Sequence, residues 1–291
     1  MRVNTLIIGA GRSGTTTLCK ILEEHSQVCF SKIKEVHYFS ITDLNSRGKE
    51  YYHSFFPHYK NHKIVASADT YLLMDYDAIK RIKEYNPNMK IVVMLRNPVN
   101  RAYSSYNYSV NYGYHNAYTS FLNSINEETS ITEEKSIVQR NNLGHFYGSL
   151  YHKHLSQWIK AFPKDNFLIL TTNELKSEKL KQKISAFLSI DLFTEQESKN
   201  NKNHNPNAVP KFKAFEQFLL NRDNPVRKFI RWVVPSFLKK LIIHSNIVDK
   251  IHDINRKASE YLPLDSKTRD KASEYFIKDL KELKKDFNIE F

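Results

Sequence analysis

Cysteine, glycine and proline are scarce in this chain, with 2, 7 and 9 residues among 291. The two cysteines, Cys19 and Cys29, are too few for a disulfide framework and lack the spacing of a metal site, so the sequence is typical of a protein from a reducing compartment. No stretch rich in proline, glycine and serine divides the chain into balanced halves. We therefore predict a single domain over residues 1–291, large enough to bury its own core.

Long apolar runs are also missing. The apolar stretch at residues 6–8 is too short for a signal peptide and leads directly into a glycine-rich bend. No apolar stretch elsewhere in the sequence is long enough to cross a bilayer. These observations favour a cytoplasmic location.

Acidic side chains are outnumbered by basic ones. Lysine and arginine number 44 against 31 aspartates and glutamates, which gives a formal net charge of +13. Such an excess suits an acidic partner: a nucleic acid, an anionic membrane surface, an anionic glycan or a polyanionic nucleotide. The sequence lacks the signatures of RRM, KH, zinc-finger and helix-turn-helix modules. We predict no nucleic-acid partner, and a basic nucleic-acid-binding protein is the less favoured alternative.

Three of the seven glycines lie in the first turn, where an apolar strand leads into residues 9–14 and then into a helix. This arrangement directs backbone N–H groups and the positive end of a helix dipole at one point, which suits a phosphate or sulfate. Four residues separate Gly9 from Gly14, as in the nucleotide-binding loop GxxxxGK[ST], but Thr15 stands where that loop has lysine, and the cation is Arg12. ATP-dependent phosphoryl transfer relies on that lysine, so a kinase is disfavoured and the loop is expected to hold another anion.

Short apolar strands alternate with amphipathic helices, which predicts an α/β domain with a central parallel sheet flanked by helices. The expected strands are residues 3–8, 64–68, 90–95 and 167–170, with a shorter one near residue 28. The expected helices are residues 15–25, 49–59, 76–85, 98 onwards, 148–162, 182–188, 212–220, 225–243 and 266–287. Residues 116–142 are expected to form loop with one helix. Asp265 is the expected N-cap of the last helix, with the apolar stripe Ala272, Phe276, Leu280 and Leu283.

The strand at residues 90–95 leads directly into Arg96, and Pro98 suits the first turn of the next helix. Arg96 therefore stands at the carboxyl end of a parallel strand, the edge where ligands bind in open α/β sheets. Together with residues 9–17 and 34–39, residues 95–106 closely resemble the sulfotransferases that use 3′-phosphoadenosine 5′-phosphosulfate (PAPS). The resemblance is strongest to the heparan-sulfate-type branch and its bacterial carbohydrate sulfotransferase relatives. It extends to residues 151–175 and 261–265 and so covers most of the chain.

This resemblance implies a three-layer, P-loop-like domain with a helical C-terminal extension, in which residues 198–262 form a variable loop and a helical cap. It implies in-line transfer of a sulfuryl group from PAPS to a hydroxyl or amino group of a carbohydrate or glycolipid acceptor. A small non-carbohydrate alcohol is the alternative acceptor. The twelve histidines show no metal-ligand spacing, so we expect no metal requirement.

The resemblance also implies which residues bind the donor. The 5′-phosphosulfate would be held by Arg12 and the residues that follow it in the loop, and the 3′-phosphate by Arg96 and Ser104. The complete set of expected donor-binding residues is Arg12, Ser13, Gly14, Thr15, Thr16, Thr17, Arg96, Ser104 and Lys211. Two cationic, N–H-rich sites at one sheet edge suit a donor with two separated anionic groups.

Glu35 is implied to be the base that removes the acceptor's proton, and Arg12 is the catalytic cation that replaces the loop lysine of many animal members. His37 is the alternative base, because imidazole titrates near neutrality. Lys34 either favours the carboxylate form of Glu35 or contacts the substrate. The structural alternatives are a solvated Lys34–Glu35 surface pair and a His37 that packs on Phe39.

One departure from the family pattern concerns residues 66–71, where several animal glycan enzymes carry Glu-Lys before a serine or threonine. That lysine is missing here. Lys34, Lys63 and a contact made only with substrate are the open candidates for its replacement. Asp69 and Tyr71 lie in this segment and are expected to bind the acceptor, although a turn or helix-cap role suits Asp69 equally well.

Two basic segments follow the predicted sheet. Residues 199–213, which contain Lys211, either close over the adenosine of the donor or form a solvated loop. Residues 225–243 are basic and amphipathic, which suits either a peripheral contact with a membrane or an ordinary helix pair that covers the core.

Overall fold

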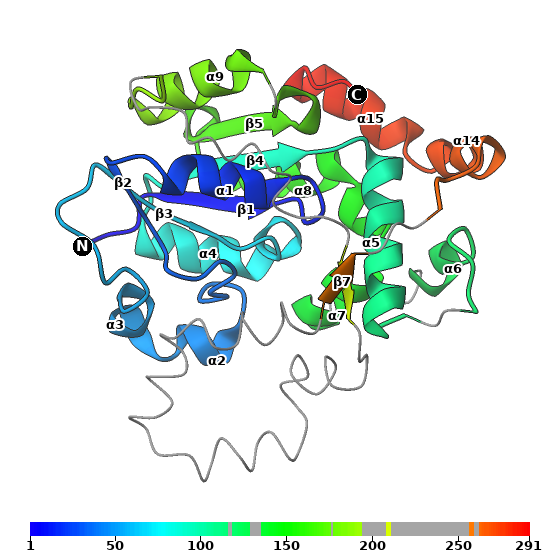
Figure 1. Ribbon diagram of the computed structural model, residues 1–291, viewed down its shortest axis with the longest axis horizontal. Coiled ribbons are helices and arrows are strands. Elements are labelled where there is room, and N and C mark those ends of the chain that lie inside the picture. Colours follow the sequence, from blue (N-terminus) through cyan, green and yellow to red (C-terminus); the bar gives the residue numbers. More distant parts are fainter. Residues whose placement is uncertain (116–117, 129–134, 176, 194–207, 211–255, 259–261) are drawn as a thin grey trace, which may run out of the picture.

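A five-stranded parallel sheet forms the centre of the molecule, with the strand order β2-β3-β1-β4-β5 (Figure 1). The computed structural model describes the chain except for residues 116–117, 129–134, 176, 194–207, 211–255 and 259–261. The strands are β1 (Thr5–Gly9), β2 (Val28–Phe30), β3 (Ile64–Ala68), β4 (Lys90–Leu95) and β5 (Phe167–Thr171). Every strand expected from the sequence is present, to within two residues at its ends.

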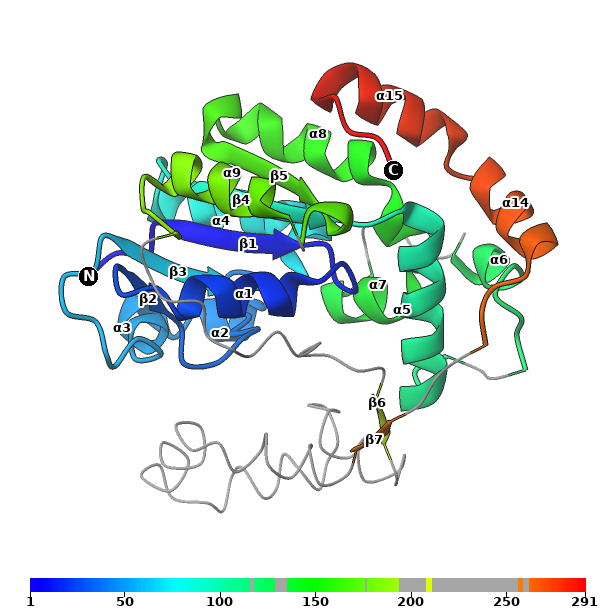
Figure 2. The ribbon, with the colours of Figure 1, turned by 45° about the horizontal axis from the view of Figure 1, so that its top comes forward.

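The larger helices lie on both faces of this sheet, beside one of its edges and outside that helical layer (Figure 2). They are α1 (Thr15–Glu23), α4 (Tyr76–Tyr85), α5 (Pro98–Tyr112), α8 (Tyr151–Ala161), α9 (Glu178–Leu188), α14 (Ser266–Glu274) and α15 (Ile277–Phe287). Shorter helices are α2 (Thr42–Asn45), α3 (Gly48–His53), α6 (Ser124–Glu128) and α7 (Ile137–Leu143), with 3₁₀ turns η1 (Leu72–Met74), η2 (Tyr147–Ser149), η3 (Lys164–Asn166) and η4 (Thr172–Glu174).

Because side chains alternate along the strands, a separate apolar cluster forms on each face of the sheet. Leu6 and Ile8 of β1 pack with Trp158 of α8 and with residues of α4, whereas Ile7 lies in a second cluster with Leu18 of α1 and residues of α9. All five of these side chains are essentially inaccessible to solvent. The sheet is therefore buried on both faces, and the predicted three-layer α/β architecture is confirmed.

The C-terminal helix differs from its prediction because it is two helices. The expected N-cap is present, since the Asp265 carboxylate accepts a hydrogen bond from Thr268 N at 2.9 Å. The helix then ends before Phe276, which is fully buried and stacks on Phe146 with ring centroids 5.6 Å apart. α14 packs on α5 and α15 packs on α8. The break between them therefore allows the apolar side chains of each half to face a different helix. The buried Leu283 contributes to the α8 side.

Two further segments, one before β5 and one after it, depart from the sequence prediction. Residues 118–128 and 135–143 contain two helices, α6 and α7, rather than one. Inside the predicted loop and cap, β6 (Ala208–Pro210) pairs antiparallel with β7 (Arg256–Ala258). Lys211 and the predicted helices at residues 212–220 and 225–243 lie outside the described residues. Among the described helices, none is long and apolar enough to span a membrane.

The parallel topology gathers the functional candidates. The carboxyl ends of all five strands meet at one edge, so the segments that follow β1, β2, β3, β4 and β5 lie together there. The backbone confirms this, because Glu35 N, after β2, donates to Ala68 O at the end of β3, and Asp69 N donates to Ile7 O of β1. Motifs that are far apart in the sequence are thereby joined at a single place.

Candidate functional site

The loop after β1 is shaped by its glycines. Gly14 adopts a left-handed backbone with φ 83° and is the N-cap of α1, so the loop turns directly into the amino end of that helix. A Cβ atom on Gly14 would lie 2.6 Å from Leu175 Cδ1, so that side chain would have to shift, and the positive φ itself favours glycine. Ser13, one of the predicted donor-binding residues, has a fully buried side chain, so it supports the loop from within. Helix amino ends of this kind bind anions through backbone N–H groups and the helix dipole.

The second cationic segment follows β4. Asn97 caps α5 by accepting a hydrogen bond from Asn100 N at 3.2 Å, and Pro98 occupies the first turn as expected. Arg96 precedes this cap, and its Nη1 donates to Arg12 O at 3.3 Å, so the two basic segments are in direct contact. Between them lies a pocket of about 420 Å³, lined by Arg12, Gly14, Arg96, Asn97, Asn100, Thr172 and Asn173. A pocket with an arginine from each segment suits a ligand that carries phosphate groups.

Arg12 itself has a left-handed backbone, with φ 69°, a conformation uncommon outside glycine and concentrated at functional sites. Its Nε donates to Ser104 Oγ at 3.2 Å, and its guanidinium lies over the Tyr108 ring at 5.0 Å from the centroid. Both partners belong to α5. The Arg12 side chain is therefore held on the α5 side of the loop, next to a residue expected to bind the 3′-phosphate.

Lys34 occupies the other side of the loop. Its Nζ donates to Thr15 Oγ1 at 3.2 Å and to Thr16 Oγ1 at 3.1 Å, in the first turn of α1. The same ammonium lies 3.3 Å from Glu35 Oε1. The Lys34–Glu35 pair expected as a structural alternative therefore exists, but its side chains are only 30% and 26% exposed and it contacts the anion loop.

Glu35 is held rigidly at the end of β3. Its backbone is left-handed, with φ 62°. Its Oε2 accepts a hydrogen bond from Thr70 N at 2.8 Å and its Oε1 accepts one from Thr70 Oγ1 at 3.1 Å. These contacts, with the neighbouring Lys34, fix the direction of the Glu35 side chain relative to the loop.

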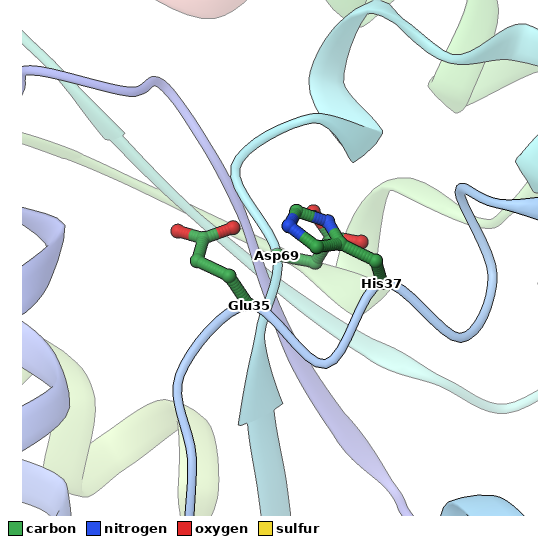
Figure 3. A group of neighbouring side chains, drawn as sticks. All are labelled: Glu35, His37 and Asp69. Carbon is green, nitrogen blue, oxygen red and sulfur yellow. The ribbon is translucent and has the colours of Figure 1, made fainter. Parts of the chain in front are cut away.

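His37 lies between two carboxylates, with its ring between Glu35 and Asp69 (Figure 3). Its Nδ1 is 3.1 Å from Asp69 Oδ1, and its ring is 4.4 Å from that of Tyr71. Ser40 Oγ donates to Asp69 Oδ2 at 2.6 Å. Burial opposes the charge of Asp69, but His37, Ser40 and the Tyr71 N–H together hold the pKa of this carboxyl below its usual value. Asp69 therefore stays ionised and orients the imidazole.

The same three residues have the composition of a metal-ligand set, since ligand atoms of Glu35, His37 and Asp69 lie within 4.8 Å of one another. Their oxygens already accept hydrogen bonds from Thr70 and Ser40, as well as the contact with Lys34. These contacts fix the direction of both carboxylates.

Most of the predicted site residues lie together. Gathered at the sheet edge are Arg12, Gly14, Thr15, Thr16, Lys34, Glu35, His37, Asp69, Tyr71, Arg96 and Ser104. Thr17 lies in the first turn of α1, and its N–H donates to Gly14 O, so it belongs to the loop-to-helix junction. Lys211 lies outside the described residues.

Several residues that support this site were not among the expected site residues. Arg101 is almost fully buried, and its Nε donates to Gly11 O in the loop at 3.0 Å while its Nη1 donates to His145 O at 3.0 Å. Thr172 and Asn173, at the end of β5, line the pocket. The only sequence signal for them was position: each follows a strand or lies on the helix that follows Arg96.

An anion loop with arginines beside it at the carboxyl edge of a parallel sheet is typical of α/β proteins whose sites suit phosphate-bearing ligands. The model of the sulfotransferase domain family matches residues 3–232, and the chain belongs to this family. The resemblance read from the motifs is thereby confirmed.

Individual relatives agree with this membership. Membrane-associated sulfotransferase kil1 of Dictyostelium discoideum is 31% identical over 137 residues, which are 45% of this chain and 29% of that protein. Heparan sulfate glucosamine 3-O-sulfotransferase 6 of Homo sapiens is 26% identical over 180 residues, covering 60% of this chain and 47% of that protein. The chain thus spans about half or less of the length of these relatives. A crystal structure of a sulfotransferase from Alicyclobacillus acidocaldarius shares the fold, with a TM-score of 0.55 and 24% identity over 68% of this chain and 87% of that one.

Proposed function

We propose that the protein transfers a sulfuryl group from PAPS to a hydroxyl or amino group of a carbohydrate or glycolipid. The observation that carries this proposal is the meeting, at one sheet edge, of a pocket with two arginines and a carboxylate–imidazole–carboxylate group. Membership of the sulfotransferase family supports the sulfuryl group as the one transferred. The net charge of +13 suits a polyanionic donor and an anionic glycan.

PAPS as the donor is supported by two sets of anion-binding groups at the same sheet edge. A nucleotide with a 3′-phosphate and a 5′-phosphosulfate needs two anion sites held a fixed distance apart. One is formed by the loop at residues 9–14 and the amino end of α1, and the other by Arg96 and Ser104 beside α5. The contact between Arg96 Nη1 and Arg12 O fixes these two sites relative to each other.

The chemistry follows from the groups beside the loop. The base removes the proton of the acceptor hydroxyl, whose oxygen attacks sulfur in line with the bond to the 5′-phosphate. The new S–O bond forms as that bond breaks, and the nucleotide leaves as the 3′,5′-bisphosphate (PAP) with the electron pair. Glu35 is the proposed base, because Thr70 fixes its carboxylate at the mouth of the loop. His37, oriented by Asp69, is the second candidate for this step.

A carbohydrate acceptor is supported by the relatives, among which are heparan sulfate 3-O-sulfotransferases and N-deacetylase/N-sulfotransferases. We test this with PAPS and a panel of glycans, glycolipids and small alcohols, measuring PAP release and the mass of the sulfated product. The expected outcome is a sulfated glycan or glycolipid and one PAP per sulfate added. If only small alcohols are sulfated, the acceptor is a non-carbohydrate alcohol. If no acceptor gives a sulfated product and PAP does not bind, the proposal is refuted.

A further inference from the structure

A second set of side chains with the composition of a metal site lies where α15 packs on α8. Within the part of the chain that the structure describes, His152, Glu282 and Asp286 each place a ligand atom within 4.8 Å of the other two. His152 is the second residue of α8, and the two carboxylates belong to α15, which lies beside α8 (Figure 2). The set takes no part in the proposed reaction. Because 134 residues of chain separate His152 from Asp286, no local sequence spacing indicates it.

The geometry of the two helices suits a small divalent ion. Glu282 and Asp286 are four residues apart and therefore share one face of α15. Bonds of about 2.0–2.2 Å from zinc to nitrogen and oxygen place neighbouring tetrahedral ligands about 3.4 Å apart. His152 Nε2 lies 2.9 Å from Asp286 Oδ2, close to that spacing. Glu282 is 35% exposed, so its side chain has space to turn its carboxylate toward the other two ligands.

Contacts that do not involve the ligand atoms fix the position of α15 on α8. Asp279, one turn before Glu282, accepts hydrogen bonds from His152 N at 3.1 Å and from Lys153 N at 3.0 Å. It thereby satisfies N–H groups in the first turn of α8. The Phe287 ring lies 6.0 Å from the His152 ring, which limits the directions open to the imidazole. The three ligands are therefore held near one another before an ion binds.

The hydrogen bonds at His152 indicate where an ion would bind. Ser156 Oγ donates to His152 O at 2.7 Å, so its oxygen acts as an acceptor toward Nε2, 3.3 Å away. Asp286 Oδ2 is a second acceptor beside the same nitrogen. Nε2 therefore carries the ring proton in this arrangement. A metal ion takes the place of that proton, between the imidazole and the Asp286 carboxylate.

The types of ligand select the class of ion. Mg²⁺ and Ca²⁺ prefer ligand sets made only of oxygen, whereas imidazole suits Zn²⁺ and its neighbours among the transition metals. The cation already near the set is Lys285, with Nζ 3.7 Å from Glu282 Oε2 and a side chain that is 73% exposed. An ion pair as exposed as this contributes little free energy, so it gives way to a metal ion.

We propose that His152, Glu282 and Asp286 bind a divalent transition metal ion, for which Zn²⁺ is the probe, and that the ion fastens α15 to α8. Three protein ligands leave one tetrahedral position for water. The inference is independent of the proposed function, since the site needs neither the donor nor the acceptor.

The test measures Zn²⁺ binding to the full chain after treatment with a chelator. All titrations use a His37→Gln background, so that the metal-ligand set at the sheet edge lacks its imidazole. Calorimetry is expected to show one Zn²⁺ per chain. His152→Gln and Asp286→Asn are each expected to weaken binding by at least about 100-fold, because removing a ligand costs more than the 10- to 100-fold loss typical of an outer contact.

A second measurement tests the fastening of the two helices. Zn²⁺ is expected to slow amide hydrogen exchange in Ile277–Phe287, and to have no such effect in His152→Gln, because only the imidazole connects the ion to α8. Glu290→Gln is the matched control: it removes a carboxylate charge from the same end of the chain but lies outside the ligand set. This control should keep the affinity for Zn²⁺. Far-ultraviolet circular dichroism shows that each variant is folded.

Each outcome decides the assignment. If Zn²⁺ does not bind, or binds His152→Gln as tightly as its parent, the site is refuted while the proposed function stands. If Mg²⁺ binds as tightly as Zn²⁺, the carboxylates act alone and the role of the imidazole is refuted. If Zn²⁺ binds through His152 without slowing exchange in α15, the ion does not fasten the helices and that part of the proposal fails.

Discussion

Arg101 links the anion loop to the buried segment before α8, and its removal is expected to damage stability and donor binding together. Two of its hydrogen bonds are short, from Nε to Gly11 O and from Nη1 to His145 O, each at 3.0 Å. In Arg101→Met, Gly11 O loses this donor inside the protein, at about 1–3 kcal/mol, whereas His145 O still accepts a hydrogen bond from Ser149 Oγ at 2.9 Å. Burial lowers the pKa of Arg101, so removing the buried charge returns part of this cost. We expect a net loss of about 1–3 kcal/mol of unfolding free energy.

Urea unfolding measures this loss, and calorimetric titration with PAP measures its effect on the loop. Because Gly11 is part of the loop, we expect the affinity for PAP to fall by about tenfold, the equivalent of one weakened hydrogen bond. Arg140→Met is the matched control: Arg140 is also buried, but its Nη1 donates to Met74 O, outside the loop. This control should lose stability and keep its affinity for PAP. A stability loss below about 1 kcal/mol for Arg101→Met, or an unchanged affinity, would refute the reasoning.

Three further predictions concern the loop, the base and a buried carboxyl. Gly14→Ala should lower the unfolding free energy, measured in urea, by about 1–2 kcal/mol, because L-residues resist the left-handed backbone. The same loss is expected in a Leu175→Ala background, where the steric contact with Leu175 is gone. If the loss disappears in that background, the steric contact is its cause. Glu35→Gln should lower kcat by about 10²–10⁴-fold with an unchanged affinity for PAP, whereas unchanged turnover would assign the base to His37. Burial raises the pKa of Glu128 from 4.5 to about 7, so its stabilising contribution is full below pH 4.5 and is lost as the pH rises through 7, by about 3 kcal/mol. Urea unfolding between pH 5 and pH 8 should show this decline in the wild type and a correspondingly flatter curve in Glu128→Gln, and equal slopes would contradict the assignment.

Local patterns were sufficient for most of the fold. The apolar strands at residues 64–68 and 90–95 and the helix at residues 76–85 have the predicted bounds, because each is a short segment whose periodicity and flanking residues specify it. Pro98 and Asp265 mark helix starts as expected, since a cap is a contact between neighbours in the chain. The break before Phe276 was missed, because it depends on which other helices support each half of the stripe.

The sequence was sufficient to predict which residues form the site, but not how their side chains are arranged. The sequence by itself determined the loop at residues 9–17, Arg96 at a strand end and the Lys34–Glu35 pair, because strand ends of a parallel sheet share one edge. Only the tertiary structure decided that the Arg12 side chain contacts α5 and that the Lys34 side chain contacts Thr15. The direction of Arg12 depends on its left-handed backbone, and both directions depend on contacts across 92 and 19 residues of chain, which no local periodicity encodes.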